Sequence, residues 1–271
     1  MERARVVEYP CRVCRVTRRA RLGLLWALLG AAILAAGLAP PVPQDPAYHR
    51  MADARAVWGI PSALNVLSNA PFVLVGALGL WSLRPGGVGA GARFIEAGER
   101  WPYLAFFAGL ALTGLGSAFY HLATGNERLV WDRLPLAITL MGLFAATIVE
   151  RISPRVGLFL LGPLVALGIV SVLQWYAGEG RGEGDLRFYA LVQFYPMLAI
   201  PLTALLFPSR YTRNWDLVTV VALYGLGKLF ELLDARIFSL GGVVSGHTLK
   251  HLAAALSGYW VWRMLLKRQP A

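Results

Sequence analysis

The sequence predicts an all-α, polytopic membrane protein in which a seven-transmembrane-helix bundle is preceded by one extra N-terminal transmembrane helix. Long apolar runs recur from residue 22 almost to the C-terminus, and a helix needs about 20 apolar residues to cross a bilayer. Only 15% of the 271 residues are charged, whereas a soluble domain carries about 25%. The net charge of +11 comes largely from basic residues that flank the apolar runs, which is typical of membrane orientation rather than of nucleic-acid binding.

The N-terminal part divides into a basic segment and an apolar one. Residues 1–20 hold six arginines without apolar periodicity, which predicts a basic cytoplasmic tail or sequence upstream of the natural start. Cys11 and Cys14 form a CxxC pair there, but two thiols alone do not complete a structural zinc site. Residues 21–40 predict the extra transmembrane helix; a signal-anchor or a cleaved signal peptide is the alternative, because small residues close this run.

Residues 45–267 predict one seven-helix membrane domain. Proline and glycine mark the joins between its apolar runs. Arginines concentrate in alternate connections, so the positive-inside rule places both termini in the cytoplasm. The expected helices are 61–83, 102–124, 131–150, 156–176, 188–207, 216–237 and 245–266.

This orientation brings four polar side chains to one level of the membrane. His247 and His251 lie where the last helix enters from the outer face, and His121 lies at the outer end of an earlier helix. Asp132 begins the next helix on the same side. Because the orientation was derived from the arginines alone, this coincidence supports a common site near the outer face.

The three histidines predict a metal site. His247 and His251 are spaced i, i+4 and therefore share one helix face. A single membrane histidine most often bonds to a neighbouring helix, but three at one depth suit Zn²⁺ and leave a fourth position open for water. The open position favours a catalytic over a structural role for the metal, because zinc lowers the pKa of bound water to about 7. The sequence therefore predicts zinc bound by His121, His247 and His251.

Ser117 and Asp132 are the candidate catalytic residues. Ser117 lies one turn before His121, so it can hold the water or donate to an oxyanion; the structural alternative is a bond to a carbonyl one turn earlier. Asp132 can act as a general base that later protonates the leaving group. Its structural alternative is to cap a helix beginning there, with Pro135 at the third helical position.

Two further polar groups lie on other predicted helices. The amides and hydroxyl of the first group are expected to bind neighbouring helices; they belong to Asn65, Ser68 and Asn69. The second group predicts a salt bridge inside the bundle, with its last member as a possible partner for a histidine; it comprises Lys228, Glu231 and Asp234.

In order and spacing these motifs resemble those of the alkaline ceramidases. That family belongs to the CREST superfamily of seven-helix membrane hydrolases, which also includes adiponectin-receptor-like proteins. Each motif is weak alone, but the ordered set is specific and covers about residues 45–267. The resemblance is closest to bacterial members, which share Gly-Ile-Pro and Val-Ser-Gly-His-Thr-Leu-Lys-His. The motifs are Asn-x-x-Ser-Asn at 65–69, Gly-Ser-x-x-Tyr-His at 116–121, Asp-Arg-Leu-Pro at 132–135 and His-x-x-x-His at 247–251.

The resemblance implies a zinc-dependent amidohydrolase that cleaves the amide bond of ceramide or a related N-acyl lipid to a fatty acid and an amine. It implies that His121, His247 and His251 are the zinc ligands and that Ser117 and Asp132 are the polar partners of the water. A membrane lipid is then the expected partner, and the inner membrane of a bacterium is the expected location.

The sequence departs from the eukaryotic ceramidases at two places. Those enzymes carry an acidic calcium cluster before the second helix, where this sequence has Ser62 and a nearly isolated Asp53, so calcium is not predicted. They also carry an aromatic residue just before the second histidine of the pair. Lys250 stands there in this sequence, which suggests a different lipid head group.

Three other functions fit parts of the same pattern. A zinc-containing lipid receptor or sensor of the adiponectin-receptor type would bind lipid without hydrolysis and dock a partner through its basic cytoplasmic ends. A lipid ester hydrolase would differ only in its substrate. A transporter would need a polar track across the membrane, of which the sequence shows only part.

Overall fold

The computed structural model describes residues 16–86, 94–213 and 215–271. Within these ranges the regular structure is helical, apart from isolated bridges between single residues. Cys11, Cys14 and most of the predicted basic tail at 1–20 lie outside the described residues. The all-α class predicted from the sequence is confirmed.

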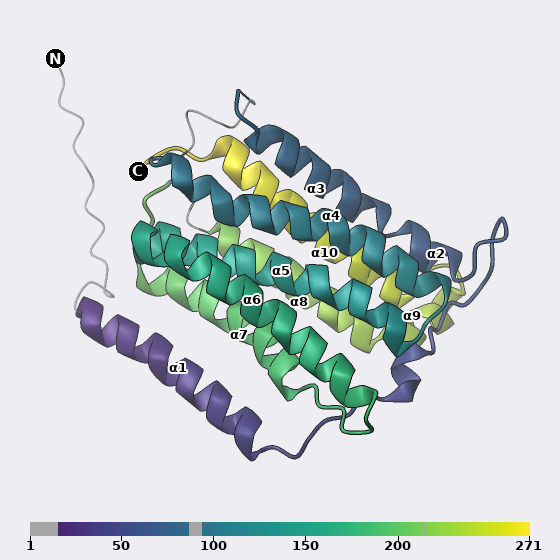
Figure 1. Ribbon diagram of the computed structural model, residues 1–271. Coiled ribbons are helices and arrows are strands. Elements are labelled where there is room, and N and C mark those ends of the chain that lie inside the picture. Colours follow the sequence, from purple (N-terminus) through teal and green to yellow (C-terminus); the bar gives the residue numbers. More distant parts are fainter. Residues whose placement is uncertain (1–15, 87–93, 214) are drawn as a thin grey trace.

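The long helices run along one another as a single bundle (Figure 1). Each predicted transmembrane helix has a counterpart, although two of them are split into separate pieces. The α-helices are α1 (Arg18–Leu38), α2 (Ala63–Leu67), α3 (Ala70–Leu83), α4 (Arg100–Leu122), α5 (Asn126–Arg151), α6 (Pro154–Glu179), α7 (Arg187–Leu206), α8 (Asp216–Leu232), α9 (Asp234–Gly241) and α10 (Gly246–Lys267), with 3₁₀ helices η2 (Pro46–His49) and η3 (Ala97–Glu99).

The helix lengths and surfaces identify a polytopic membrane protein. In the part of the chain that the structure describes, six helical stretches are long and apolar enough to cross a membrane. Large apolar side chains such as Trp26, Leu74, Phe159 and Leu198 are exposed on their outer faces, as a lipid environment allows and water does not favour. The shorter α8 and the more polar α10 are not among the six stretches, but they lie within the same bundle (Figure 1).

Two predicted helices are interrupted, and proline explains the first interruption. The run predicted at 61–83 breaks between α2 and α3. Pro71 in the first turn of α3 has no N–H to donate to the carbonyl of Leu67, and its ring would clash with that carbonyl in a continuous helix. The run predicted at 216–237 breaks at Leu233, where α8 ends and α9 begins.

The start of α5 corrects the alternative reading of Asp132 as a helix cap. The helix begins at Asn126, directly after the extended residue Gly125 (φ 174°), and not near residue 131 as predicted. Asn126 and Glu127 supply the polar first turn instead. Asp132 therefore lies inside the helix, and Pro135 lies in its interior rather than in its first turn.

The extra helix α1 lies outside the seven-helix block, against α7 (Figure 1). None of its residues is buried. Arg187, at the start of α7, donates to the carbonyls of Ala36 and Ala39 at 3.2 and 2.5 Å and forms an ion pair with Asp185 at 2.7 Å. This arginine holds the pKa of Asp185, in the preceding loop, at about 2. The end of α1 is thus tied to the bundle by one charged side chain.

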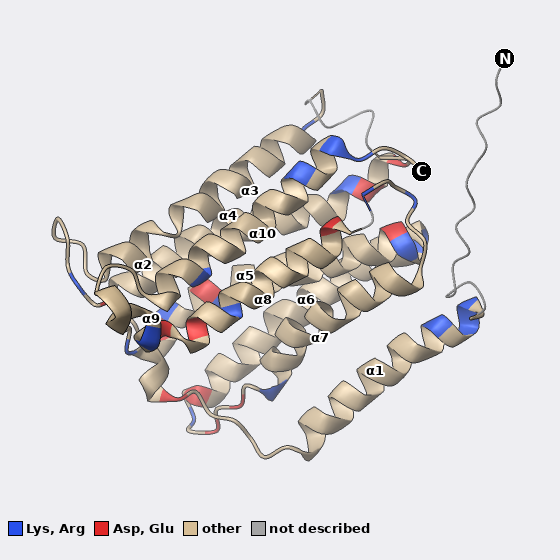
Figure 2. Ribbon diagram, turned by 180° about the vertical axis from the view of Figure 1, so that it is seen from behind, with Lys and Arg blue, Asp and Glu red and all other residues tan. Residues whose placement is uncertain are grey.

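The two ends of the bundle differ in charge. Basic residues gather around the end that carries the C-terminus and the start of α1, as Figure 2 shows. Arg268 is buried there and pairs with Glu150, whose carboxylate also accepts a 2.6 Å hydrogen bond from Tyr103. The opposite end mixes acidic and basic residues, and the predicted site residues lie toward that end.

Candidate metal centre

The structure brings the three predicted histidines together from two helices. His121 comes from the last turn of α4, while His247 and His251 come from the first turns of α10. Their ring centroids are 4.8–5.0 Å apart, and one nitrogen from each ring lies within 4.8 Å of the other two. All three side chains are buried, with exposures of 2–4%. Among the described residues they form a group that can hold a metal ion.

The unpaired ring nitrogens support that interpretation. His247 Nε2, His251 Nε2 and both ring nitrogens of His121 are buried and have no hydrogen-bond partner among the described residues. Buried polar atoms in folded proteins are nearly always paired, because an unpaired one loses its hydration without compensation. A metal ion would satisfy one nitrogen on each ring. Three imidazoles suit zinc, copper, iron and nickel alike.

Ser68 orients one of the rings. Its hydroxyl lies 2.8 Å from His251 Nδ1, which leaves Nε2 directed toward the other histidines. Metal-ligating histidines usually have their second nitrogen fixed in this way. The sequence predicted only a structural role for Ser68, because its contact depends on the break between α2 and α3 and on the rotation of α10.

The start of α10 is held in place by polar contacts from three segments. Ser245 caps the helix by accepting from the N–H of Thr248 at 3.2 Å, and the hydroxyl of Thr248 donates to Asn65 at 2.9 Å. Asp234, at the start of α9, accepts from the N–H of His247 at 2.7 Å. The predicted partnership between Asp234 and a histidine therefore involves the backbone of His247 and not its imidazole.

A loop before α2 supports Asn65 in turn. Asn65 donates to the carbonyl of Asp53 at 3.1 Å. Arg55 pairs with the Asp53 carboxylate at 2.7 Å and also donates to the carbonyls of Gly242 and Val243, which link α9 to α10. The hydrogen bonds from Arg55 hold the pKa of Asp53 below its ordinary value. This arginine joins the loop to the segment that carries the histidine pair.

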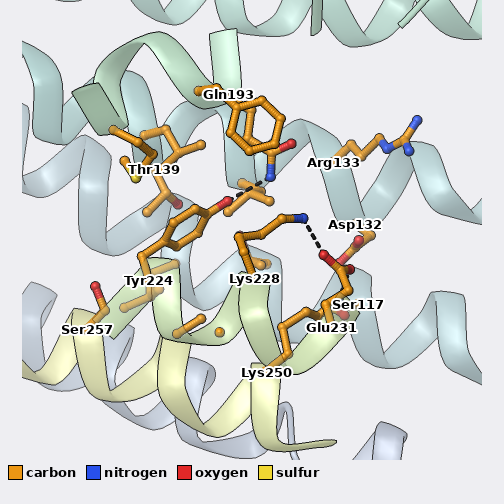
Figure 3. Close-up of a pocket in the computed structure, with 18 of the residues that line it drawn as sticks. Ser117, Asp132, Arg133, Thr139, Gln193, Tyr224, Lys228, Glu231, Lys250 and Ser257 are labelled. Carbon is orange, nitrogen blue, oxygen red and sulfur yellow. Dashed lines mark hydrogen bonds and ion pairs between the residues drawn. The ribbon is translucent and has the colours of Figure 1, made fainter. Parts of the chain in front are cut away.

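Ser117 and Asp132 meet because α4 and α5 approach closely beside them. A Cβ on Gly116 would overlap the carbonyl of Trp131, so the close approach requires glycine. That carbonyl has no helical partner, because Pro135 one turn later has no N–H to donate. The side chains of Ser117 and Asp132 lie near each other in Figure 3 and line the same cavity. Among the described residues, Ser117 does not form its predicted alternative, a bond to a carbonyl one turn earlier.

A cavity of about 270 Å³ opens beside these residues. One part of its wall is polar and includes Ser117, Asp132, Glu231, Lys250 and His251, as Figure 3 shows for most of them. The rest of the wall is mainly apolar, with side chains from α3, α4, α5, α7, α8 and α10; it includes Phe72, Phe106, Leu110, Leu143, Met197 and Val220. Such a division suits a ligand with a polar group and an acyl chain.

The predicted salt bridge inside the bundle forms, but one of its three residues differs from the prediction. Lys228 and Glu231 form an ion pair on α8, but Asp234 faces the start of α10 instead. Lys250 from α10 takes its place and lies 2.9 Å from Glu231. The sequence singled out Lys250 only through its position beside His251. Its partner could not be predicted, because α8 and α10 meet only in the folded bundle.

Replacing Ser68 with alanine is expected to weaken metal binding about 10- to 100-fold, the usual effect of removing a hydrogen bond behind a histidine ligand. Competition with a chromogenic chelator would measure it in purified protein. Ser257→Ala is the matched control, because this buried serine of α10 bonds the carbonyl of Val220 and touches no histidine. Equal affinities in wild type and Ser68→Ala would contradict the role.

Three buried imidazoles that can hold a metal ion thus lie close to a largely apolar cavity, whose wall includes His251, Ser117 and Asp132. No protein-family model matches this sequence, and no curated protein matches it either.

Proposed function

We propose that the protein is a zinc-dependent intramembrane hydrolase that cleaves the amide bond of ceramide or a related N-acyl lipid, as the resemblance to the alkaline ceramidases implies. One observation carries the proposal. Three buried histidines with unpaired ring nitrogens lie together among the described residues, and one of them, His251, lines a largely apolar cavity with Ser117 and Asp132.

The donor set fits zinc. His121, His247 and His251 would hold the ion through one nitrogen each, and their three-imidazole set leaves a position free, as in known catalytic zinc sites. When bound, zinc would polarise the acyl carbonyl and make a water acidic enough to react near neutral pH. No thiol is needed for this set.

Asp132 supplies the proton transfer. Its carboxylate faces the cavity, where it can take a proton from the attacking water and deliver it to the amine nitrogen as the C–N bond breaks. One water is consumed: its oxygen leaves in the carboxylate of the acyl part, and both of its protons leave on the amine, which is released as an ammonium group. Ser117 lies near Asp132 in the same cavity wall, where its hydroxyl can steady the attacking water or donate to the developing oxyanion.

The charge at the two ends of the bundle supports an orientation in the membrane. The C-terminal end is rich in arginine, and under the positive-inside rule this supports a cytoplasmic position for both termini. The histidines then lie toward the outer face, and the inner membrane of a bacterium is the proposed location. The acyl chain would extend from the metal centre into the apolar part of the cavity.

The test is release of fatty acid by the purified, zinc-loaded protein from a panel of N-acyl lipids and matched esters. Hydrolysis of amides is expected. Hydrolysis of esters alone would identify a lipid ester hydrolase instead. Metal-loaded protein that binds lipids but hydrolyses none of them would contradict an enzymatic role and favour a lipid receptor.

A further inference from the structure

Two of the three lysines in the whole sequence lie in the cavity wall, at positions 228 and 250. The chain uses arginine at nearly every other basic position, so lysine is concentrated at this site. Lys228 lies on α8, and Lys250 lies on α10 directly before the metal-ligand candidate His251. Figure 3 shows the Lys228 ammonium group directed into the space near Asp132 and Glu231.

Both lysines share a single carboxylate. Glu231 forms ion pairs with Lys228 and with Lys250, in the latter case at 2.9 Å, and it also accepts a hydrogen bond from Tyr48 at 3.3 Å. In the part of the chain that the structure describes, neither lysine forms an ion pair with another carboxylate. One glutamate therefore balances only one of the two ammonium groups.

The cavity wall as a whole also carries more positive than negative charges. Its charged residues are three cations and two carboxylates, namely Arg133, Lys228, Lys250, Asp132 and Glu231. Charges at membrane depth are costly unless they are paired. A simple structural ion pair between Lys228 and Glu231 would need no second lysine from another helix. The cavity thus favours a ligand that brings a negative charge.

We infer that Lys228 and Lys250 bind an anionic group on the amine part of the lipid, so that the preferred substrate is an N-acyl lipid with a carboxylate or phosphate head group. This inference rests on the proposed function and names its substrate class. Lys250 is adjacent to His251 and reaches across to α8, so the two ammonium groups lie beside the site where the amide would bind. The mainly apolar wall is left for the acyl chain.

A matched set of ligands tests the inference. N-acylglycine and N-acylethanolamine with the same acyl chain differ chiefly in having a carboxylate or a hydroxyl, and N-acyl-phosphoethanolamine carries a phosphate. A charge-assisted hydrogen bond predicts that wild-type protein binds the two anionic lipids about tenfold or more tighter than the neutral one. Ligand-induced thermal shifts would report binding, and fatty-acid release would report kcat and KM.

Lysine variants separate recognition from packing. Lys250→Met and Lys228→Met are each expected to reduce the preference for anionic over neutral lipids, chiefly by raising KM for the anionic ones. Lys267→Met, at the end of α10 and outside the cavity, is the control and should keep the preference. Zinc content is measured in each variant, because Lys250 is adjacent to His251.

The outcomes are distinct. Equal binding of the charged and neutral lipids by wild-type protein would overturn the inference, and so would lysine variants that weaken both classes equally. Selective binding of anionic lipids without any hydrolysis would support the inference while contradicting the proposed enzymatic function. A preference for carboxylate over phosphate, or the reverse, would identify which anionic head group the site accepts.

Discussion

Replacing Asp132 with asparagine is expected to lower the rate of lipid hydrolysis by about 10²–10⁴-fold, the usual contribution of a general acid–base group. Asparagine keeps the shape of the side chain but can neither take the proton from water nor pass it to the amine. The three histidines are untouched, so zinc content should stay at the wild-type level. Single-turnover release of fatty acid would measure the chemical step, and elemental analysis would measure the metal.

Glu183→Gln is the control for the loss of a carboxylate at the same end of the molecule. Its side chain is 74% exposed and lies outside the cavity, so turnover should be unchanged. Wild-type turnover in Asp132→Asn would rule out the role of Asp132 in proton transfer. Loss of zinc along with activity would show instead that the carboxylate supports the metal.

The proximity of Ser117 and Asp132 in the cavity wall leads to a second expectation. If Ser117 acts by positioning the carboxylate, Ser117→Ala should slow hydrolysis in wild-type protein but have little further effect in Asp132→Asn. Groups that act as one unit are strongly non-additive in this way. Fully additive effects would show that the serine acts on the substrate independently of Asp132.

The membrane helices could be predicted because hydropathy is a local property of the chain. An apolar run of adequate length is recognisable whatever packs against it. The interruptions within two of these helices were harder to predict. Pro71 gives a local signal for the first interruption, because it cannot donate to the carbonyl of Leu67. The break at Leu233 has no proline, and it coincides with contacts from Asp234 to the start of α10 that form only in the folded state.

The candidate site could be predicted only to the level of membrane depth. The distribution of arginines predicts which way each helix runs, and this prediction brings His121, His247 and His251 to one level. Rotation and tilt about the helix axes depend on packing. They decide that Ser68 contacts His251 and that Lys250 reaches Glu231, and no spacing in the sequence contains that information.

Replacing His251 with alanine is expected to remove most of the bound zinc. Two imidazoles would remain, on α4 and α10, without the third ligand that completes the group. Elemental analysis of purified protein would measure the loss. His49→Ala is the matched control, because His49 is the one other histidine in the sequence; it bonds Tyr120 and Asn126 and lies outside the group. Equal zinc in wild type and His251→Ala would refute the ligand assignment.

The three single variants should also differ among themselves. His121→Ala leaves His247 and His251, which are one turn apart on a single helix and can still hold a metal together. His247→Ala and His251→Ala each leave one ligand on α10 and one on α4, so the remaining pair depends on helix packing. His121→Ala should therefore retain the most zinc. Because metal that binds only the folded state stabilises it, chelation should lower the Tm most in wild type, less in His121→Ala and least in the other two.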